Sequence, residues 1–369
     1  MSFKLKTYQA PDFTQPSLMN APEARLEPAP FDKVAPDGYH ATTIFPEYFK
    51  VGSQWLLAEE SRMDCVAVFE NGKIHVREFR NLKKGDLVFT GRKEDGEEGI
   101  FVYPDGFREL GQDGVEAPGE AFAFRQSRSR ETAFSRDYDN IYELLEYEKE
   151  HGYVVWVLGP ACAFDADSRA AFSKLVMNGY VDALLAGNAL ATHDLEAAYL
   201  NTALGQNIYT QESQPNGHYN HLDTINRVRA CGSIPAFLRE EHIQDGIIYT
   251  LEKKGVPYVL AGSIRDDGPL PPVYGNVYAA QDAMRNQVRT ATTVICMATA
   301  LHTIATGNMT PSYRVLADGT VRQVYFYCVD ISEFTVNKLS DRGSLSARGI
   351  VTNAQDFIVN LNKELSRDM

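Results

Sequence analysis

Four short, mostly apolar segments recur along the later part of the chain, and they constrain its fold more than any other feature. Stretches with the apolar spacing of helices lie between them. Because a strand that is apolar on both faces must be covered by helices on both faces, this alternation predicts an α/β fold with a doubly wound, mostly parallel sheet. We assign this domain to residues 138–369. The four segments are residues 153–158 (YVVWVL), 181–186 (VDALLA), 256–261 (VPYVLA) and 323–331 (QVYFYCVDI).

The longest apolar stretch in this part is residues 291–305 (ATTVICMATALHTIA). It is shorter than the roughly 20 residues that a membrane-spanning helix needs, and it contains a histidine. We therefore interpret residues 280–305 as a buried helical stretch and predict no membrane partner. Apolar helices of this kind also favour burial between subunits, so we expect a homo-oligomer.

The N-terminal part of the chain has a different residue composition and hydrophobic pattern. Residues 1–36 contain six prolines and no sustained hydrophobic period, which predicts an extended arm. Residues 37–137 contain short β-rich runs broken by glycine, and Asn71-Gly72 between alternating apolar residues predicts a hairpin. We therefore predict a small antiparallel β domain, joined through a polar link at residues 125–137 to the helix that opens the larger domain.

Charge and cysteine content limit the partners and the compartment. A net charge of −13, with no run of lysine and arginine, argues against a nucleic-acid partner. The N-terminus lacks the apolar segment of a secretory signal, and the five cysteines form no CxxC pair, so we expect the reducing cytoplasm. There is no P-loop for ATP-driven chemistry and no GxSxG elbow for a serine nucleophile.

In a doubly wound sheet, ligands bind beyond the carboxyl ends of the strands, near the point where the strand order reverses. The candidate segments are therefore residues 159–164, 187–196 and 262–271, together with Asp330. The first three begin with glycine, which lets a backbone approach a ligand closely. The chain contains no GxG, so the usual GxGxxG dinucleotide motif is absent. Each glycine turn is either a phosphate-binding turn at a helix N-terminus or a tight turn only.

Charge is concentrated in the sequence RDDG at residues 265–268. Arg265 can clamp a carboxylate, and Asp266 or Asp267 can hold an ammonium or act as a general base. The alternative is an arginine–aspartate ion pair that only stiffens a proline-rich loop. The position directly after a predicted strand favours the functional interpretation.

Several histidines are candidates for proton transfer. His218 and His221 lie three residues apart at the start of a predicted helix, and His193 follows a glycine turn. No HExxH motif or cysteine pair accompanies them, so hydrogen-bonding, proton-transfer or partly buried histidines are favoured over a metal site. We interpret His302 as a core residue. Cys65 has no base beside it in the sequence and is interpreted as a small buried hydrophobe.

Longer strings cover the chain from about residue 38 to its end. They are GYHATTIFPEYF, MDCVAV and KKGDLVFTG in the β-rich part, and GYVDALLAGNALATHDLEAA, GHYNHLDTIN, GVPYVLAGSIRDDGPLP, AQDAMR, ATGNM, CVDI, KLSDRGS and GIVT beyond it. Together they resemble the archaeal-type ornithine cyclodeaminases and the C-terminal part of the bifunctional arginine dihydrolase/ornithine cyclodeaminases, a family also described by a lysine-oxoglutarate reductase/saccharopine dehydrogenase conserved region. No arginine dihydrolase domain precedes the match, so that activity is not implied. Residues 312–327 interrupt the family pattern and predict an added hairpin.

The resemblance implies a Rossmann-like domain, similar to deoxyhypusine synthase, that binds NAD and converts L-ornithine to L-proline and ammonia. A hydride leaves the amine-bearing carbon, the second amine attacks the imine, ammonia leaves and the hydride returns. A closed site would protect the imine from water, and the β domain is expected to cover it.

The residues implied in this site fall into three groups. The catalytic group is Asp266, Asp267, His218 and His221, and the substrate-binding group is Arg265, His40, Thr42, Asp64, Cys65 and Asn226. The cofactor-binding group is Gly159, Pro160, Ala161, Gly187, Asn188, Ala189, His193, Asp194, Gly262, Ser263, Asn308, Asp330 and Asp341. No metal site is expected.

Two alternatives to ornithine cyclisation stay open at the level of sequence. One is a related NAD enzyme that acts on another amine or amino acid, such as an aminobutyl transferase or an opine- or saccharopine-type dehydrogenase. The other is a protein that binds NAD or an amino acid without catalysis. The sequence does not distinguish NAD from NADP.

Overall fold

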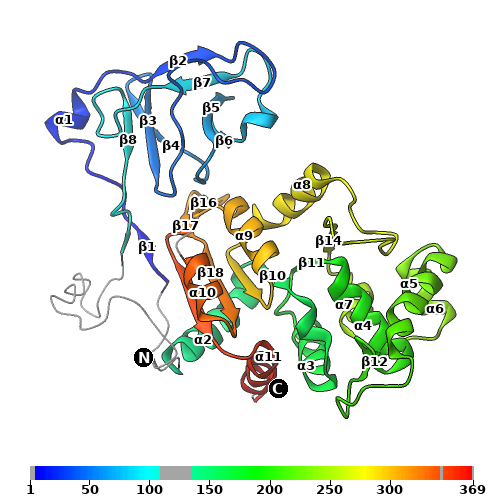
Figure 1. The fold of residues 1–369 in the computed structure, drawn as a ribbon. Coiled ribbons are helices and arrows are strands. Elements are labelled where there is room, and N and C mark those ends of the chain that lie inside the picture. Colours follow the sequence, from blue (N-terminus) through cyan, green and yellow to red (C-terminus); the bar gives the residue numbers. More distant parts are fainter. Residues whose placement is uncertain (1–4, 109–134, 341–343, 368–369) are drawn as a thin grey trace.

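The computed structural model describes residues 5–108, 135–340 and 344–367. A small β domain lies on one side of a larger α/β domain (Figure 1). Asp341 and most of the polar link at 125–137 lie outside the described residues.

The larger domain is built on one six-stranded sheet in which every neighbouring pair of strands is parallel. In chain order, the strands read third, second, first, fourth, fifth and sixth across the sheet, which is the usual order of a Rossmann fold. The strand order therefore reverses between the first and fourth strands. Across the sheet the strands are β14 (Tyr258–Ala261), β11 (Ala183–Gly187), β10 (Val154–Leu158), β15 (Thr293–Met297), β18 (Tyr325–Asp330) and β19 (Ala347–Val351).

The predicted doubly wound sheet is confirmed, but two of its strands were not predicted. The segment 280–305 is not one helical stretch: α8 (Val277–Val288) is followed by β15 and then by α9 (Ala300–Met309). β15 lies beside β10 at the reversal point and is fully buried. Its apolar character therefore reflects a central strand and does not support burial between subunits. β19, at the edge of the sheet, also had no predicted counterpart.

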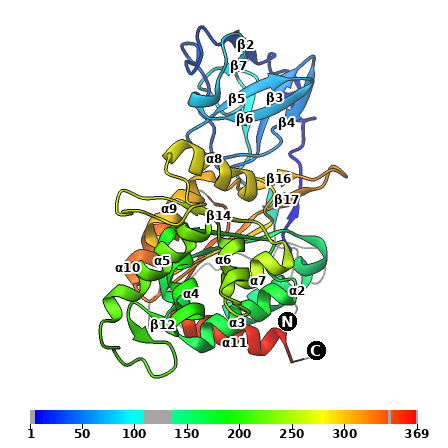
Figure 2. The ribbon, with the colours of Figure 1, turned by 90° about the vertical axis from the view of Figure 1, so that its right-hand side faces the viewer.

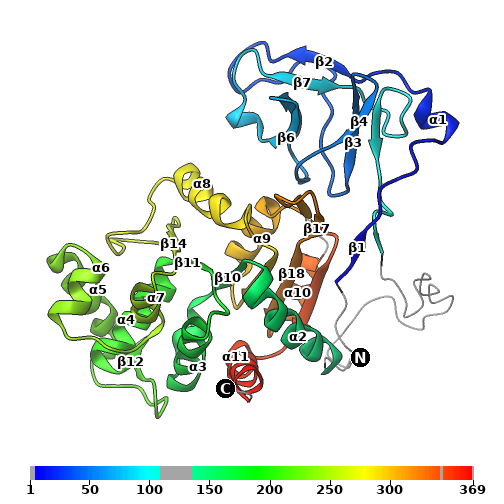
Figure 3. The ribbon, with the colours of Figure 1, turned by 180° about the vertical axis from the view of Figure 1, so that it is seen from behind.

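Helices cover both faces of the sheet because its strands are apolar on both faces. Along β10, Trp156 and Leu158 pack into the core on one face, whereas Val155 and Val157 pack into the core on the other. The first face is covered by α2 (Ser135–His151), α3 (Ala166–Met177), α4 (Asn188–Leu200), α7 (Ile247–Lys254) and α11 (Ala354–Leu365), and the second by α8 and α9 (Figures 1 and 3). Two further helices, α5 (Asn220–Cys231) and α6 (Ile234–Glu240), lie beyond α4, and α10 (Glu333–Ser340) packs beside β18 and β19.

The small β domain contains a four-stranded and a three-stranded antiparallel sheet. Asn71 and Gly72 have φ angles of 52° and 78°, so the predicted hairpin turn is confirmed. The four-stranded sheet is β2 (Arg25–Pro28), β7 (Leu87–Thr90), β5 (Val66–Glu70) and β6 (Lys73–Arg77), and the three-stranded sheet is β4 (Gln54–Leu57), β3 (Glu47–Val51) and β8 (Ile100–Val102).

The proline-rich N-terminal segment is part of this β domain rather than a separate arm. Its strand β2 pairs with β7, and the Lys50 ammonium donates hydrogen bonds to the carbonyls of Met19 (2.8 Å) and Ala21 (2.7 Å). Ahead of it, β1 (Thr7–Tyr8) pairs with β9 (Phe107–Arg108). This segment therefore forms short strands, turns and the one-turn helix α1 (Pro16–Met19), and its prolines do not detach it from the fold.

Within the predicted insertion at 312–327, residues 313–323 form a hairpin of β16 (Tyr313–Val315) and β17 (Val321–Gln323) that joins the two domains, whereas residues 325–327 belong to β18 of the six-stranded sheet. The Ser312 N–H donates to the Ser61 carbonyl and the Val315 N–H to the Glu59 carbonyl, each at 2.9 Å. The buried Tyr313 hydroxyl donates to the Ala58 carbonyl at 2.9 Å. The β domain therefore rests on this hairpin and on α8 (Figure 2).

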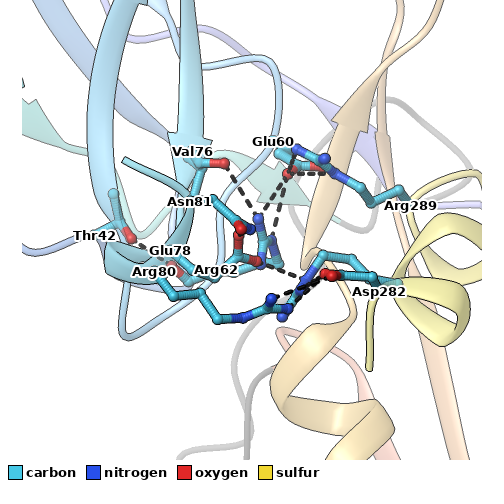
Figure 4. A network of polar contacts seen from close by, with 10 residues as sticks. Thr42, Glu60, Arg62, Val76, Glu78, Arg80, Asn81, Asp282 and Arg289 are labelled. Carbon is cyan, nitrogen blue, oxygen red and sulfur yellow. Dashed lines mark hydrogen bonds and ion pairs between the residues drawn. The ribbon is translucent and has the colours of Figure 1, made fainter. Parts of the chain in front are cut away.

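A cluster of charged side chains adds to the contact between the domains (Figure 4). We call it the interdomain ion cluster. Across the boundary, Arg80 pairs with Asp282 at 2.5 Å, and Arg289 pairs with Glu60 at 3.0 Å. Its members from the β domain are Glu60, Arg62, Glu78 and Arg80, and its members from α8 and the residue after it are Asp282, Arg285 and Arg289.

Glu78 lies at the centre of this cluster. It accepts a hydrogen bond from Arg62, and Arg285 lies 2.6 Å from it. Burial alone would raise the pKa of Glu78, but the two guanidinium groups lower it to about 2 from an ordinary value of 4.5. A carboxylate with a lowered pKa stabilises the fold above its unfolded pKa. This contribution is therefore present above about pH 4.5 and disappears as the pH falls towards 2.

Glu78→Gln is expected to lower the free energy of unfolding by about 2 kcal/mol, because the neutral amide leaves the buried Arg62 guanidinium undercompensated. Urea unfolding followed by tryptophan fluorescence measures this, with Trp55 in the β domain and Trp156 in the sheet. Glu70→Gln is the matched control, since the Glu70 side chain is 50% exposed and its one ion pair among the described residues is with Arg77. Equal losses in the two variants would contradict a stabilising role for the cluster.

Candidate active site at the carboxyl end of the sheet

The two turns that flank the reversal point touch through their backbones. The Gly159 N–H donates to the Met297 carbonyl at 2.8 Å, and a Cβ atom at Gly159 would lie only 1.8 Å from the Ala298 oxygen. Ala298 itself has φ 54°, an uncommon conformation for a non-glycine residue and one that clusters at functional sites. Pro160 and Ala161 then open a short 3-10 helix, η2 (Pro160–Ala163). The glycine after β10 is therefore required by close backbone approach.

The second glycine turn, after β11, leads into α4 without a capping side chain. A Cβ at Gly187 would lie 2.8 Å from Cε1 of His302, so a side chain at this position would have to displace the His302 ring. Because no side chain caps α4, the N–H groups of its first turn, which includes Asn188 and Ala189, remain available at the positive end of the helix dipole. A phosphate group is the kind of ligand that such a helix start binds.

The loop after β14 carries the RDDG sequence and is tied to its neighbours. Within it, the Ser263 N–H donates to Asp266 Oδ2 at 2.8 Å. The Leu270 N–H donates to Asn188 Oδ1 at 3.0 Å, and Arg229 of α5 donates to the Pro269 carbonyl at 3.2 Å. The Asn188 side chain, predicted to contact the cofactor, therefore holds this loop against α4.

The two aspartates of this loop, Asp266 and Asp267, differ in their exposure to solvent. Asp266 is partly buried, whereas Arg265 and Asp267 are exposed. Gly262 also lies close to a backbone, since a Cβ there would be 2.6 Å from the Tyr274 oxygen. The structure therefore brings Asp266 into the rim of the sheet and leaves Asp267 at the surface.

His302 belongs to this rim, although the sequence pattern placed it in the core. It lies on the first turn of α9, with Nδ1 3.3 Å from Thr299 Oγ1. Burial lowers the pKa of His302 below 6.5, against smaller opposing effects of the Asp266 charge and of a hydrogen bond with the Ala261 backbone. His302 lies five residues beyond the end of β15, and this position would have identified it as a site residue. The sequence pattern did not show β15 to be a strand, so this position could not be used.

His193 is held on α4 by an acidic partner. Its Nδ1 lies 2.8 Å from Glu196 Oε2, and its ring centroid lies 5.6 Å from Phe164 and 6.1 Å from His221. His221 is partly buried, and His218 is exposed, with its ring centroid 4.3 Å from that of Tyr219. Glu196 was not among the predicted site residues, because a histidine and a glutamate three residues apart on a helix resemble an ordinary surface pair.

Asp194 and Asn308, both predicted to bind the cofactor, have other contacts or positions than this prediction assumed. The Asp194 carboxylate is buried and accepts from Arg169 Nε at 2.8 Å and from the N–H groups of Ile247 and Ile248 at 3.0 and 2.8 Å, so it anchors the start of α7. Asn308 lies in the last turn of α9, at the end of the helix away from the rim. Asn226 is exposed on α5.

The remaining predicted cofactor residue, Asp330, ends β18 at the same rim, where its Oδ1 accepts from the Ser332 N–H at 2.8 Å.

The predicted substrate residues of the β domain do not reach this rim within one chain. His40 Nε2 lies 3.0 Å from Glu47, and Thr42 donates to the Arg62 carbonyl at 2.5 Å. Cys65 is buried, and burial raises the pKa of its thiol to about 11, so it is not a nucleophile near neutral pH. No hydrogen bond or ion pair within the described ranges joins these side chains, or that of Asp64, to the turns that follow the strands.

Two wider features are absent from the described parts of the chain. No helix there is long and apolar enough to cross a membrane. No group of three or more histidine, cysteine, aspartate or glutamate side chains there is arranged to hold a metal ion.

Comparison with known proteins identifies the family. The family model described as arginine dihydrolase ArgZ-like, C-terminal, Rossmann fold matches residues 140–361. The ornithine cyclodeaminase of Methanopyrus kandleri is 39% identical over 348 residues, which cover 94% of this chain and 79% of that protein. That of Methanocaldococcus jannaschii is 39% identical over 354 residues, with 94% and 78% covered. The bifunctional arginine dihydrolase/ornithine cyclodeaminase AgrE of Nostoc is 33% identical over 94% of this chain and 47% of its own length.

Solved structures give the same relationship. A conserved putative LOR/SDH protein from Methanococcus maripaludis superimposes with a TM-score of 0.82 at 38% identity, covering 94% of this chain and 99% of that one. AgrE in a ternary complex with ornithine and NAD+ superimposes with a TM-score of 0.58 at 31% identity, covering 95% of this chain and 47% of that one. The chain therefore belongs to the family that contains the archaeal ornithine cyclodeaminases and the C-terminal Rossmann-fold part of the ArgZ-like arginine dihydrolases.

Proposed function

We propose that the protein is an NAD-dependent ornithine cyclodeaminase that converts L-ornithine to L-proline and ammonia. The observation that carries this proposal is the convergence of two glycine turns, the uncapped start of α4, Asp266 and His302 at one rim of a Rossmann sheet. The proposal is supported by relatives named ornithine cyclodeaminase, because this chain matches them over most of their length. The structure of AgrE with ornithine and NAD+ supports the choice of both ligands.

The backbone at the reversal point fits a dinucleotide. Residues 187–189 present N–H groups at the start of α4, and Ala161 presents one in η2, because Pro160 has no N–H and that of Gly159 bonds to the Met297 carbonyl. The glycines leave no Cβ between these turns and their neighbours. When bound there, NAD would supply a hydride acceptor that later returns the same hydride. The predicted contacts of Ser263 and Asp330 with the cofactor remain part of this proposal.

The charged groups at the rim suit an amino acid with two amines. Asp266 offers a carboxylate to an ammonium group, and the exposed Arg265 can pair with the substrate carboxylate. His302, with its lowered pKa, is neutral near pH 7 and can accept a proton there. His193, His218 and His221 lie on neighbouring elements and are kept as candidates for proton transfer.

The proposed reaction needs no outside oxidant. Ornithine loses a hydride and a proton to give an imine, its second amine attacks the imine carbon, ammonia leaves, and the cyclic imine regains the hydride and a proton as proline. The sum of proline and ammonia has the atoms and electrons of ornithine. We expect this chemistry to need a site that is covered from water. The cover provided by the β domain, the homo-oligomeric state and the cytoplasmic location stay predictions.

The test is to incubate the purified protein with L-ornithine and NAD and to measure proline and ammonia. Equal amounts of both, with no net NADH, are expected. L-lysine, putrescine and L-arginine replace ornithine in parallel reactions, and NADP replaces NAD. Turnover of another amine instead would favour the related NAD enzymes, and tight NAD binding without turnover of any amine would favour a non-catalytic binder; either result would overturn the proposal.

A further inference from the structure

Glu196 is the acceptor for an unusual number of buried groups. Its side chain is 0% exposed, and it accepts from Thr202 Oγ1 at 2.8 Å and from the N–H groups of Gly205 at 3.2 Å and Leu204 at 3.3 Å, besides its contact with His193. A buried carboxylate with four donors is satisfied as an anion and has no need of a proton of its own.

The contact with Glu196 determines which nitrogen of His193 carries the proton. An ionised carboxylate only accepts hydrogen bonds, so His193 Nδ1 must be the donor in the 2.8 Å contact. In the neutral imidazole, Nε2 is then the unprotonated, basic nitrogen. Among the described residues, no group makes a hydrogen bond to Nε2.

The ring of His193 lies beside segments that lead away from the candidate site. The ring packs at 5.6 Å from Phe164, which follows η2 and therefore the Gly159 turn. On its other side is the His221 ring at 6.1 Å. His193 is thus placed between the turn after β10 and the helix that carries His221.

Glu196 also places the segment that carries the other two histidines. Leu204 and Gly205, with φ angles of 54° and 74°, form the tight turn between β12 (Thr202–Ala203) and β13 (Gln206–Asn207), and both donate to Glu196. Gly205 packs directly on Gly217, where a Cβ would lie 2.4 Å from the Gly205 oxygen. Thr202 in turn accepts from Asn220 at 2.8 Å. The segment 217–221 is therefore positioned by the groups that Glu196 holds.

We propose that Glu196 is a positioning residue that keeps the proton of His193 on Nδ1, so that Nε2 takes a proton from the amine of the substrate; this inference rests on the proposed function. The N–H bond of the substrate ammonium breaks and an N–H bond forms at Nε2, while the electron pair stays on the substrate nitrogen. That free pair is what hydride loss from the neighbouring carbon requires. The same proton returns to the nitrogen that leaves as ammonia, so His193 ends the cycle as it began.

The tautomer can be measured without turnover. Long-range proton–nitrogen NMR spectra of protein labelled with ¹⁵N-histidine, with His193→Asn used to assign the signal, should give the pattern of a proton on Nδ1. In Glu196→Gln, the side-chain amide can donate to Nδ1, so the pattern should change to a proton on Nε2. A proton on Nε2 of His193 in the unaltered protein would overturn the proposal, even if the protein proves to act on another amine.

Kinetics separate positioning from a purely structural role. Glu196→Gln should lower kcat by about 10- to 100-fold and change the KM for ornithine by no more than about twofold. The double variant with Glu196→Gln and His193→Asn should have the same kcat as His193→Asn alone, because the effect of Glu196 on kcat passes through the His193 imidazole. Glu212→Gln, an exposed carboxylate of the same segment, is the matched control and should match the unaltered protein. Independent, multiplying losses in the double variant, or an unchanged kcat in Glu196→Gln, would overturn the role.

Discussion

Gly159→Ala is expected to weaken NAD binding at least about 10-fold and to lower the stability of the larger domain by about 1–3 kcal/mol. Its new methyl group would lie 1.8 Å from the Ala298 carbonyl oxygen, and the obstacle is backbone that cannot rotate away. The φ angle of Gly159 is −84°, which alanine adopts without strain, so the effect would come from crowding alone. Isothermal titration with NAD and urea unfolding measure the two quantities.

The matched control for this substitution is Gly275→Ala. A Cβ at Gly275 would meet nothing within 4 Å, and its φ lies outside the left-handed region, so it should bind NAD and unfold like the unaltered protein. If Gly159→Ala behaved like this control, the reversal point between β10 and β15 would not be the cofactor site.

Asp266→Asn is expected to lower kcat by about 10²- to 10⁴-fold, because it removes the partly buried charge at the rim while keeping the size of the side chain. The amide oxygen can still accept from the Ser263 N–H, so the loop should keep its shape. Steady-state kinetics with L-ornithine, following proline formation, measure the loss.

Asp267→Asn provides the comparison within the same loop. Asp267 is exposed, whereas Asp266 lies close enough to His302 for its charge to affect the pKa of that histidine. The loss should therefore be much smaller for Asp267→Asn. Equal rates for both variants and the unaltered protein would remove the acidic pair from the mechanism.

Much of the fold follows from local patterns. The strands β10, β11, β14 and β18 were predictable because each is an apolar run set off by glycine or charge. β15 was not, because its five buried residues continue through Ala298 and Thr299 into the apolar helix α9, with no glycine or proline between them. Length and periodicity cannot separate a strand from a helix in such a run.

Parts of the candidate site were predictable only where a single short segment contains both the strand end and the residues that follow it. The RDDG loop and the glycine turns after β10 and β11 were found because strand ends point to them. His302 was missed together with β15. The position of the β domain depends on pairs such as Arg80 with Asp282, which lie 202 residues apart in the chain, and no local pattern encodes such a pair. This is why residues such as Thr42 and Cys65 were assigned to the rim although they lie by the interdomain ion cluster.

The short connection between β15 and α9 has a consequence for how the site adapts to its substrate. Only Ala298 and Thr299 separate the end of the central strand from the helix that bears His302. Because this connection is so short, the packing of the sheet fixes the position of the His302 imidazole. Asp266 instead sits on a connection of fifteen residues between β14 and α8. We therefore expect that the aspartate, and not the histidine, changes position when proposed substrates of different length bind.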